Sequence, residues 1–139
     1  MKPSPPALEH LFTVDFEVAK PETHETTDGA RMLVMVTGGS VYGPKISGTV
    51  VAGRDWALRK PDGVVRVDVR AELRTNEGDL VLMTYRGVAT PVDAGVRILV
   101  TPSFEVASTS THEWLNRTVT VAVGSASPGA VSYDVFEVK

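Results

Sequence analysis

The sequence of residues 64–75 is VVRVDVRAELRT, in which apolar and charged side chains alternate almost without interruption. Successive side chains of a β-strand point to opposite faces, so this alternation predicts a strand with one apolar and one charged face. The apolar face carries Val65, Val67, Val69, Ala71 and Leu73, and the charged face carries Arg66, Asp68, Arg70, Glu72 and Arg74. If the charged face meets solvent, it is an ordinary sheet surface. If part of it lines a cavity, Asp68 and Arg70 become buried ionisable groups with altered pKa, which can take part in chemistry.

Turn-forming residues punctuate the rest of the chain at short intervals and predict an all-β fold. Examples are Asp28-Gly29, Gly38-Gly39, Gly53-Arg54 and Asn76-Glu77-Gly78. The runs between turns are rich in Val, Thr, Ile, Leu, Phe and Tyr and predict strands at about residues 8–18, 30–37, 45–51, 55–59, 64–75, 79–88, 96–101, 103–107, 117–124 and 131–138. Eight to ten short strands are typical of an antiparallel sandwich or barrel, and closure is favoured because an open sheet would leave two long exposed edges.

One short helix is predicted near residues 110–116, before the penultimate strand. Ser110 and Glu113 have the spacing of a capping box, in which each side chain binds the backbone amide of the other residue. The length of 139 residues fits one domain with a real core. We therefore expect a single β-barrel domain over residues 8–139, preceded by a mobile, proline-bearing tail over residues 1–7.

The composition argues against several classes of function. The net charge is −3 and no window is dominated by Lys and Arg, so we expect no nucleic-acid partner. The chain has no cysteine, which excludes disulfides, thiolate zinc sites and cysteine nucleophiles. We find neither the apolar run of a signal peptide nor one long enough to span a membrane, so we expect a soluble cytoplasmic protein without a membrane partner.

Motifs for metal, serine or phosphate chemistry are missing from the sequence. His10, His24 and His112 form no His-x-His or His-x-x-x-His pair, so no metal site is predicted. His24 lies in a polar stretch that most simply forms a solvated loop. No Gly-x-Ser-x-Gly nucleophile elbow is present, and Gly38-Gly39 lacks the helix and the Lys-Ser/Thr of a phosphate loop. These two glycines are better explained by a tight turn or a bulge at a barrel rim.

Carboxylates and arginines remain as candidates for chemistry. Asp55 follows the predicted turn at Gly53-Arg54, and Asp68 and Arg70 lie two residues apart on one strand face, close enough to pair. A surface ion pair worth about 0 to 1 kcal/mol is the simpler interpretation of that pair. Arg86 follows Tyr85 near a predicted strand end, and Glu105 follows Phe104.

Several motifs, taken together in their order and spacing, resemble one family of bacterial and fungal proteins. They are Thr37-Gly38-Gly39-x-x-x-Gly43-Pro44-x-Ile46-x-Gly48-x-Val50-x-x-Gly53-x-Asp55-Trp56, Asp68-x-Arg70-x-x-Leu73-x-Thr75-x-x-Gly78, Tyr85-Arg86-Gly87, Pro102-x-Phe104-Glu105 and Trp114-Leu115-Asn116. Over about residues 8–139 the chain resembles the family catalogued as domain of unknown function 3237. The resemblance implies a small, lipocalin-like antiparallel barrel with a cavity and says little about substrate.

The resemblance also gives weight to particular side chains, because a polar residue fixed in a barrel motif is more easily explained by a lumen than by solvent. It implies a cavity position for Asp68 and Arg70 as an alternative to the surface pair. The candidate catalytic residues are Asp55, Asp68, Arg70 and Glu105, and the candidate substrate-binding residues are Trp56, Tyr85, Arg86, His112, Trp114 and Asn116. His112 departs from the family pattern, which usually has Tyr there.

Such a cavity suits acid–base chemistry without a cofactor or metal. A carboxylate desolvated against Trp56 or Trp114 would have a raised pKa, and Arg70 or Arg86 could stabilise a developing enolate or phenolate. The working hypothesis is an isomerase, cyclase or lyase acting on a small, apolar carbonyl or phenolic compound. A non-catalytic carrier of an apolar or aromatic molecule and a purely structural oligomerisation module are the alternatives. We also expect a homo-oligomer, a dimer or larger.

Overall fold

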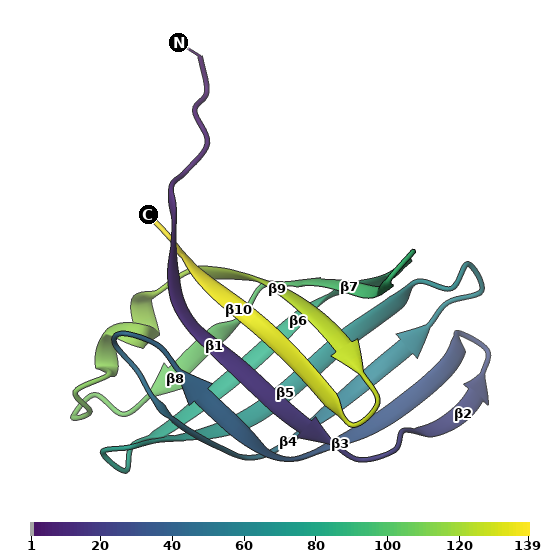
Figure 1. The fold of residues 1–139 in the computed structure, drawn as a ribbon, viewed down its shortest axis with the longest axis horizontal. Helices are drawn as coiled ribbons and strands as arrows, with labels where there is room; N and C mark the ends of the chain where they lie inside the picture. Colours follow the sequence, from purple (N-terminus) through teal and green to yellow (C-terminus); the bar gives the residue numbers. More distant parts are fainter. Residues whose placement is uncertain (1) are drawn as a thin grey trace.

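The computed structural model describes residues 2–139 and shows one antiparallel sheet of ten strands that closes into a barrel (Figure 1). The strands are β1 (Leu8–Val18), β2 (Glu22–Thr26), β3 (Gly29–Tyr42), β4 (Gly48–Arg59), β5 (Val65–Thr75), β6 (Leu80–Val92), β7 (Gly95–Val100), β8 (Ser103–Val106), β9 (Thr120–Ser127) and β10 (Ala130–Val138). A 3-10 helix, η1 (Glu113–Arg117), lies between β8 and β9.

Eight of the strands form the closed ring. β1 pairs with β10 on one side and with β3 on the other, so the ring runs β1-β10-β9-β7-β6-β5-β4-β3 and returns to β1. β2 extends β3 as a hairpin, and β8 pairs with the part of β6 that precedes its pairing with β7. The prediction of an all-β, closed antiparallel barrel with eight to ten strands is confirmed.

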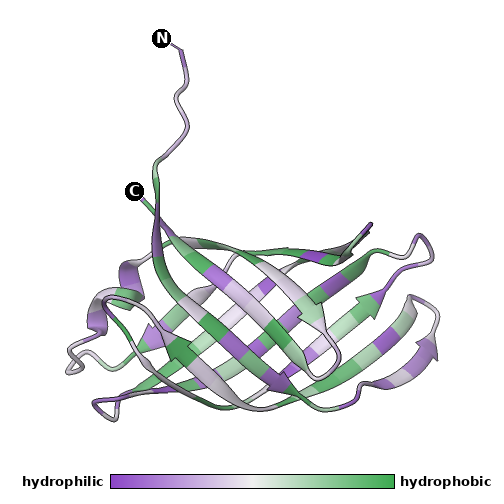
Figure 2. Ribbon diagram, viewed as in Figure 1, coloured by the Kyte–Doolittle hydropathy of each residue, from purple (hydrophilic) through white to green (hydrophobic). Residues whose placement is uncertain are grey.

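The side chains alternate between the lumen and the outer surface along most strands, as the hydropathy colours show (Figure 2). On β5 the apolar set identified from the sequence faces inward and the charged set faces outward. Large apolar side chains fill the end of the barrel nearer η1. They include Phe12, Leu73, Met83, Phe104 and Leu115, all of which are buried. The burial of these side chains contributes to the hydrophobic stabilisation of the fold.

A bulge lies within β3 beside the glycine pair at residues 38–39, at the seam with β1, and its extra residue is Thr37. Glu17 pairs with Gly38, whereas the next residue, Val18, pairs with Val36, so one residue of β3 is extra. Gly39 has a φ of +142°, in the region that favours glycine. The glycines thus lie beside a bulge inside β3 and form neither a tight turn nor the bulge itself.

The predicted turn at Gly53-Arg54 is wrong, because both residues lie inside β4. The predicted strands at 45–51 and 55–59 are therefore one strand from Gly48 to Arg59. A Cβ atom at Gly53 would lie 3.1 Å from the Cα atom of Ala71 on β5. The glycine thus permits a close approach of two strands rather than a reversal of the chain.

Two further local predictions are wrong. Residues around His24 form strand β2 instead of a loop, and all five of its residues are exposed, so no apolar alternation marks the strand. The capping box also does not form. The Ser110 hydroxyl accepts from the amide of His112 at 2.9 Å, and the Glu113 carboxylate pairs with Arg117 at 2.8 Å. The predicted helix over 110–116 is consequently a 3-10 helix that begins at Glu113.

Residues 2–7 have no regular secondary structure and lie exposed outside the barrel, whereas Met1 is outside the described residues (Figure 1). The mobility predicted for residues 1–7 stays a prediction. Within residues 2–139, no helix has the length and apolar character required to cross a membrane.

The close approach of β1 to Gly39 predicts a large penalty for a side chain there. A Cβ atom would overlap the carbonyl oxygen of Asp15 across the seam, whereas a Cβ atom at Gly129, which also has positive φ, would meet open space. We expect Gly129→Ala to lower the free energy of unfolding by about 1 kcal/mol and Gly39→Ala to lower it by at least about 2 kcal/mol more. Urea denaturation of both variants measures the difference, and equal losses would contradict a steric role for Gly39 at the seam.

Candidate functional site

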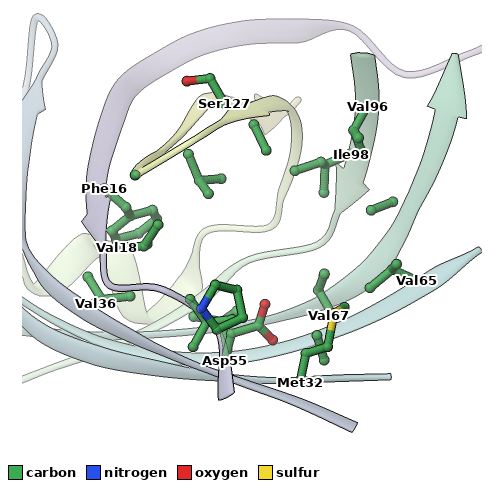
Figure 3. Close-up of a pocket in the computed structure, with 18 of the residues that line it drawn as sticks. Phe16, Val18, Met32, Val36, Asp55, Val65, Val67, Val96, Ile98 and Ser127 are labelled. Carbon is green, nitrogen blue, oxygen red and sulfur yellow. The ribbon is translucent and has the colours of Figure 1, made fainter. Parts of the chain in front are cut away.

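The end of the barrel opposite η1 is hollow and contains a cavity of about 480 Å³ (Figure 3). It opens between the β1–β2 connection and the β9–β10 turn. The lining residues are Phe16, Val18, Ala19, Lys20, Pro21, Met32, Val34, Val36, Asp55, Ala57, Val65, Val67, Val69, Tyr85, Ala89, Val96, Ile98, Ala126, Ser127, Pro128, Gly129, Val131 and Tyr133. This volume lies in the range of small-molecule sites, and the walls are almost entirely apolar.

The size of the inward side chains explains why one end is filled and the other is hollow. Inward positions near η1 carry Phe, Leu and Met, whereas those around the cavity are mostly valine and alanine, such as Ala57 and Ala89. In a barrel of eight strands the lumen is just wide enough for side chains to fill it, so small residues leave room for a ligand.

Three aromatic rings of the cavity lining pack against one another. The ring centroids of Tyr85 and Tyr133 lie 5.0 Å apart in an edge arrangement, and Phe16 lies 6.1 Å from Tyr133 and 6.4 Å from Tyr85. Burial raises the pKa of both tyrosine hydroxyls, well above the ordinary value for Tyr85. Both phenols therefore stay protonated at neutral pH, and both residues line the cavity.

Asp55 is the one carboxylic acid among the described residues that line the cavity. It projects inward from β4 among the aliphatic side chains of the wall (Figure 3). Its Oδ1 atom accepts a hydrogen bond from the backbone amide of Asp68 at 3.1 Å. Desolvation is the largest influence and raises the pKa of Asp55 to about 6, opposed by this hydrogen bond, which favours the charged form. A carboxyl group in this state exchanges protons near neutral pH.

The structure corrects the predicted cavity position of Asp68 and Arg70. Both are exposed on the outer face of β5, because Val67 and Val69 take the inward positions. Asp68 also does not pair with Arg70 as the simpler interpretation suggested. Its partner is Arg86 on β6, directly opposite in the ladder, with Arg86 Nε 3.5 Å from Asp68 Oδ1. Arg86 therefore lies outside the cavity too.

Glu105 and Trp56 also lie outside the lumen. Glu105 is exposed on β8 between the buried residues Phe104 and Val106. Trp56 is 53% exposed on the outer face of β4, because its neighbour Asp55 takes the inward position. The indole consequently does not desolvate a cavity carboxylate, and the aliphatic wall does so instead.

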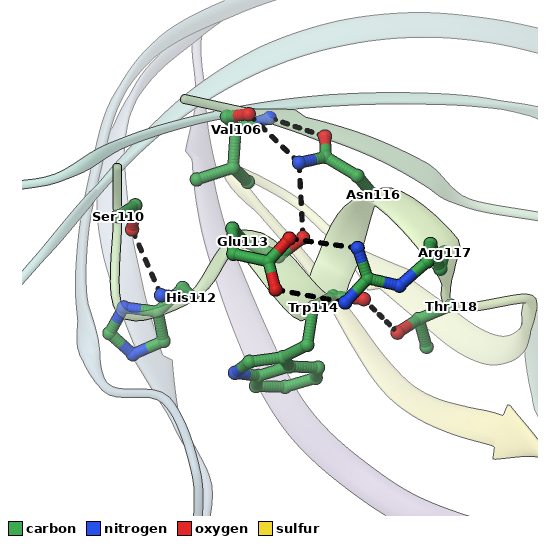
Figure 4. Close-up of polar contacts among 8 residues, drawn as sticks. All are labelled: Val106, Ser110, His112, Glu113, Trp114, Asn116, Arg117 and Thr118. Carbon is green, nitrogen blue, oxygen red and sulfur yellow. Dashed lines mark hydrogen bonds and ion pairs between the residues drawn. The ribbon is translucent and has the colours of Figure 1, made fainter. Parts of the chain in front are cut away.

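His112, Trp114 and Asn116 lie around η1, at the closed end of the barrel (Figure 4). Asn116 binds the backbone of Val106 twice, at 2.8 Å through Oδ1 and at 2.9 Å through Nδ2, which fixes η1 to β8. His112 is buried, and its Nδ1 atom is 3.5 Å from Asp79. These residues hold the end of the barrel, so their predicted contact with a ligand in the lumen is corrected.

Of the predicted site residues, Asp55 and Tyr85 share the cavity. The sequence analysis missed Tyr133 and Phe16, which complete its deep end. A signal for both was present, because each belongs to an alternating strand with buried neighbours two positions away, Val135 on β10 and Val14 on β1. Within residues 2–139, no group of three or more His, Cys, Asp or Glu side chains is arranged to hold a metal ion.

Comparison with known proteins agrees with this architecture. The model of the family described as "Protein of unknown function (DUF3237)" matches residues 6–138, which confirms the resemblance indicated by the motifs. The hydroalkoxylation enzyme phnH of Penicillium herquei is 31% identical over 116 residues, which cover 83% of this chain and 72% of that protein.

Two crystal structures are similar to this barrel. A β-barrel-like protein of Acinetobacter baumannii has a TM-score of 0.90 at 26% identity, with 99% of each chain covered. An enzyme from Penicillium herquei has a TM-score of 0.78 at 25% identity, with 100% of this chain and 98% of that chain covered.

The raised pKa of Asp55 predicts a pH dependence of stability. Because the folded-state pKa of about 6 lies above the ordinary value of 3.8, the native state binds the proton more tightly, and stability falls as the pH rises between these values. We expect Asp55→Asn, which stays neutral, to match wild type near about pH 4 and to be more stable by about 2 kcal/mol at about pH 8.

Urea denaturation at both pH values measures this difference. Glu72→Gln, on the exposed face of β5, is the control and should behave like wild type at both. A constant difference between Asp55→Asn and wild type over this range would show that Asp55 is not a desolvated acid.

Proposed function

This chain belongs to the DUF3237 family, and we propose that it is a cofactor-independent acid–base enzyme, an isomerase, cyclase or lyase, which acts on a small apolar carbonyl or phenolic compound in the barrel cavity. The observation that carries the proposal is the position of Asp55, a carboxyl group with a pKa of about 6 in an otherwise apolar cavity. Perturbed acids in clefts are candidates for proton transfer.

Asp55 has the role of the proton donor or acceptor. Near neutral pH both its neutral and ionised forms are populated, which is the condition for efficient general acid–base catalysis. The surrounding aliphatic wall excludes water and strengthens any electrostatic interaction with a bound molecule.

Tyr85 and Tyr133 take the role that the sequence analysis gave to Arg70 or Arg86. Both residues line the cavity with neutral hydroxyl groups, a kind of donor that can stabilise an oxygen that gains negative charge. Lys20 is the one basic residue among the described residues that line the cavity, and the rest of the wall is almost wholly apolar, so the site favours a small, largely apolar substrate. The apolar walls would hold a flat, partly aromatic body.

The similarity to a hydroalkoxylation enzyme indicates one reaction that this site could perform. In such a reaction the oxygen of an O–H group forms a bond to one carbon of an alkene and a proton is added to the other. When both groups belong to one molecule, the product is an isomer of the substrate. The atoms and electrons then balance without an oxidant or reductant. Asp55 would shuttle the proton, while the tyrosines orient the reacting oxygen.

A carrier of apolar molecules is the second candidate, because the walls of the cavity are almost wholly apolar. A carrier requires no ionisable group within the lumen, and burying one lowers stability. The presence of Asp55 therefore favours turnover over carriage.

Asp55→Asn tests the proton-transfer role. With phenols that carry an alkenyl chain next to the hydroxyl, we expect wild type to form the cyclic ether and Asp55→Asn to lose about 10²-fold or more of kcat. The pH profile of wild type should bend near about 6, the pKa of Asp55. Product formation is followed by chromatography, and Glu105→Gln, on the outer surface, should keep wild-type activity.

If Asp55→Asn binds these phenols and converts them as fast as wild type, the acid–base proposal is wrong. Binding without conversion in wild type, over a broad panel of such compounds, would support the carrier instead.

A bulky residue in the lumen tests where the ligand binds. Ala89 is buried in the cavity wall, whereas its neighbour Thr90 is exposed on the outside of β6. We expect Ala89→Trp to weaken binding of the fluorescent probe 2-naphthol about 10-fold or more and Thr90→Trp to leave it unchanged. Equal affinities in a folded Ala89→Trp variant would place the ligand outside the barrel.

A further inference from the structure

The hydrogen-bond ladder between β4 and β5 is interrupted beside Asp55. The ladder pairs Asp55 with Val69 and then Leu58 with Arg66, but it lacks the two pairs between them. Continuing the same register would place Trp56 opposite Asp68. A rung of the ladder is therefore missing from the wall of the barrel at the level of the cavity acid.

Two of the backbone groups of the missing rung have side-chain partners instead. The amide of Asp68 donates to Oδ1 of Asp55 at 3.1 Å, and the carbonyl oxygen of Trp56 accepts from Nη1 of Arg31 at 3.1 Å. Backbone groups in a protein wall require partners, so each side chain replaces the strand that would otherwise supply one. One of these side chains, Asp55, comes from the inside of the barrel, and the other, Arg31, comes from the outside.

From these two hydrogen bonds we infer that Arg31 is a positioning residue for Asp55. The importance of this positioning for catalysis rests on the proposed function. Arg31 lies on the outer face of β3, opposite Leu58, and does not line the cavity. By binding the carbonyl of Trp56, its guanidinium keeps that group from the amide of Asp68. The amide is then free to hold one oxygen of Asp55, which leaves the second oxygen for a substrate.

Loss of the guanidinium has a definite consequence. The carbonyl of Trp56 would lack its donor, and the amide of Asp68 is the donor that the strand register places opposite it. Re-forming the rung would take this amide from Asp55. Asp55 would then be held less firmly and would lose the hydrogen bond that favours its charged form.

The test is a carbon-13 NMR titration of the Asp55 carboxyl group in the unliganded protein, with the signal assigned by its absence in Asp55→Asn. We expect a midpoint near about 6 in wild type and near about 7 or higher in Arg31→Met, because the lost hydrogen bond to a charged group favours the neutral acid. The amide signal of Asp68 should follow this titration in wild type and cease to follow it in Arg31→Met.

Two variants separate positioning from other effects. Arg31→Lys retains a donor for the carbonyl and should restore the wild-type midpoint. Arg66 lies opposite Leu58 on β5, whereas Arg31 lies opposite Leu58 on β3. The hydrogen bond to the carbonyl of Trp56 comes from Arg31. Arg66→Met should therefore leave the Asp55 midpoint unchanged. Arg31→Thr is too short to reach the carbonyl and serves as the second variant if Arg31→Met does not fold.

An unchanged Asp55 midpoint in folded Arg31→Met or Arg31→Thr would overturn the inference, and so would an equal change in Arg66→Met. This readout needs no substrate. If Asp55→Asn retained full turnover while the Arg31 variants shifted the titration, the proposed function would fail and the positioning of Asp55 would stand. If both hold, the pH profile of turnover should shift with the midpoint measured by NMR.

Discussion

Closure of the ring between β1 and β3 is the constraint on which the rest of the molecule depends. β1 pairs with strands on both of its sides, so the ring leaves no open edge between its first and third strands. The absence of a side chain at Gly39 lets the two strands meet without a clash. Once the sheet is closed, the lumen is separated from solvent except at its mouth, and the size of the inward side chains alone decides where it is hollow. That separation from water is what gives Asp55 its raised pKa.

The cavity is also a cost to the fold. Small side chains at the open end forgo the packing that Phe12 and Met83 provide at the closed end, and an ionisable group in an apolar wall is destabilising once it is charged. Natural proteins tolerate such losses where a site requires them, provided that the remaining core is sufficient. Here the filled half of the barrel, closed by η1 and tied to β8 through Asn116, supplies the stability that the hollow half lacks.

The fold was predictable from the sequence because alternation with period two is a direct consequence of strand geometry, and β5 follows it throughout. The site was only partly predictable. On β4 the inward positions carry Asp55 and Ala57, whereas Trp56 faces outward, which is the reverse of what hydrophobicity favours. Positions where the local pattern contradicts the fold are expected at functional sites. Asp68 was misplaced for a related reason, since membership in a family motif indicates constraint but not which side of the sheet a residue faces.

The acidity of Asp55 results from two opposing features of one wall. Desolvation by the aliphatic lining favours the neutral acid, and the amide of Asp68 favours the carboxylate. With desolvation alone the group would remain protonated to higher pH, and with the amide alone it would be ionised throughout the physiological range. Together they set the midpoint of Asp55 at about 6, so that a fraction of the acid stays protonated near neutrality. The missing rung beside Trp56 is thus more than an irregularity of the sheet, because a complete ladder would use the amide that the acid requires.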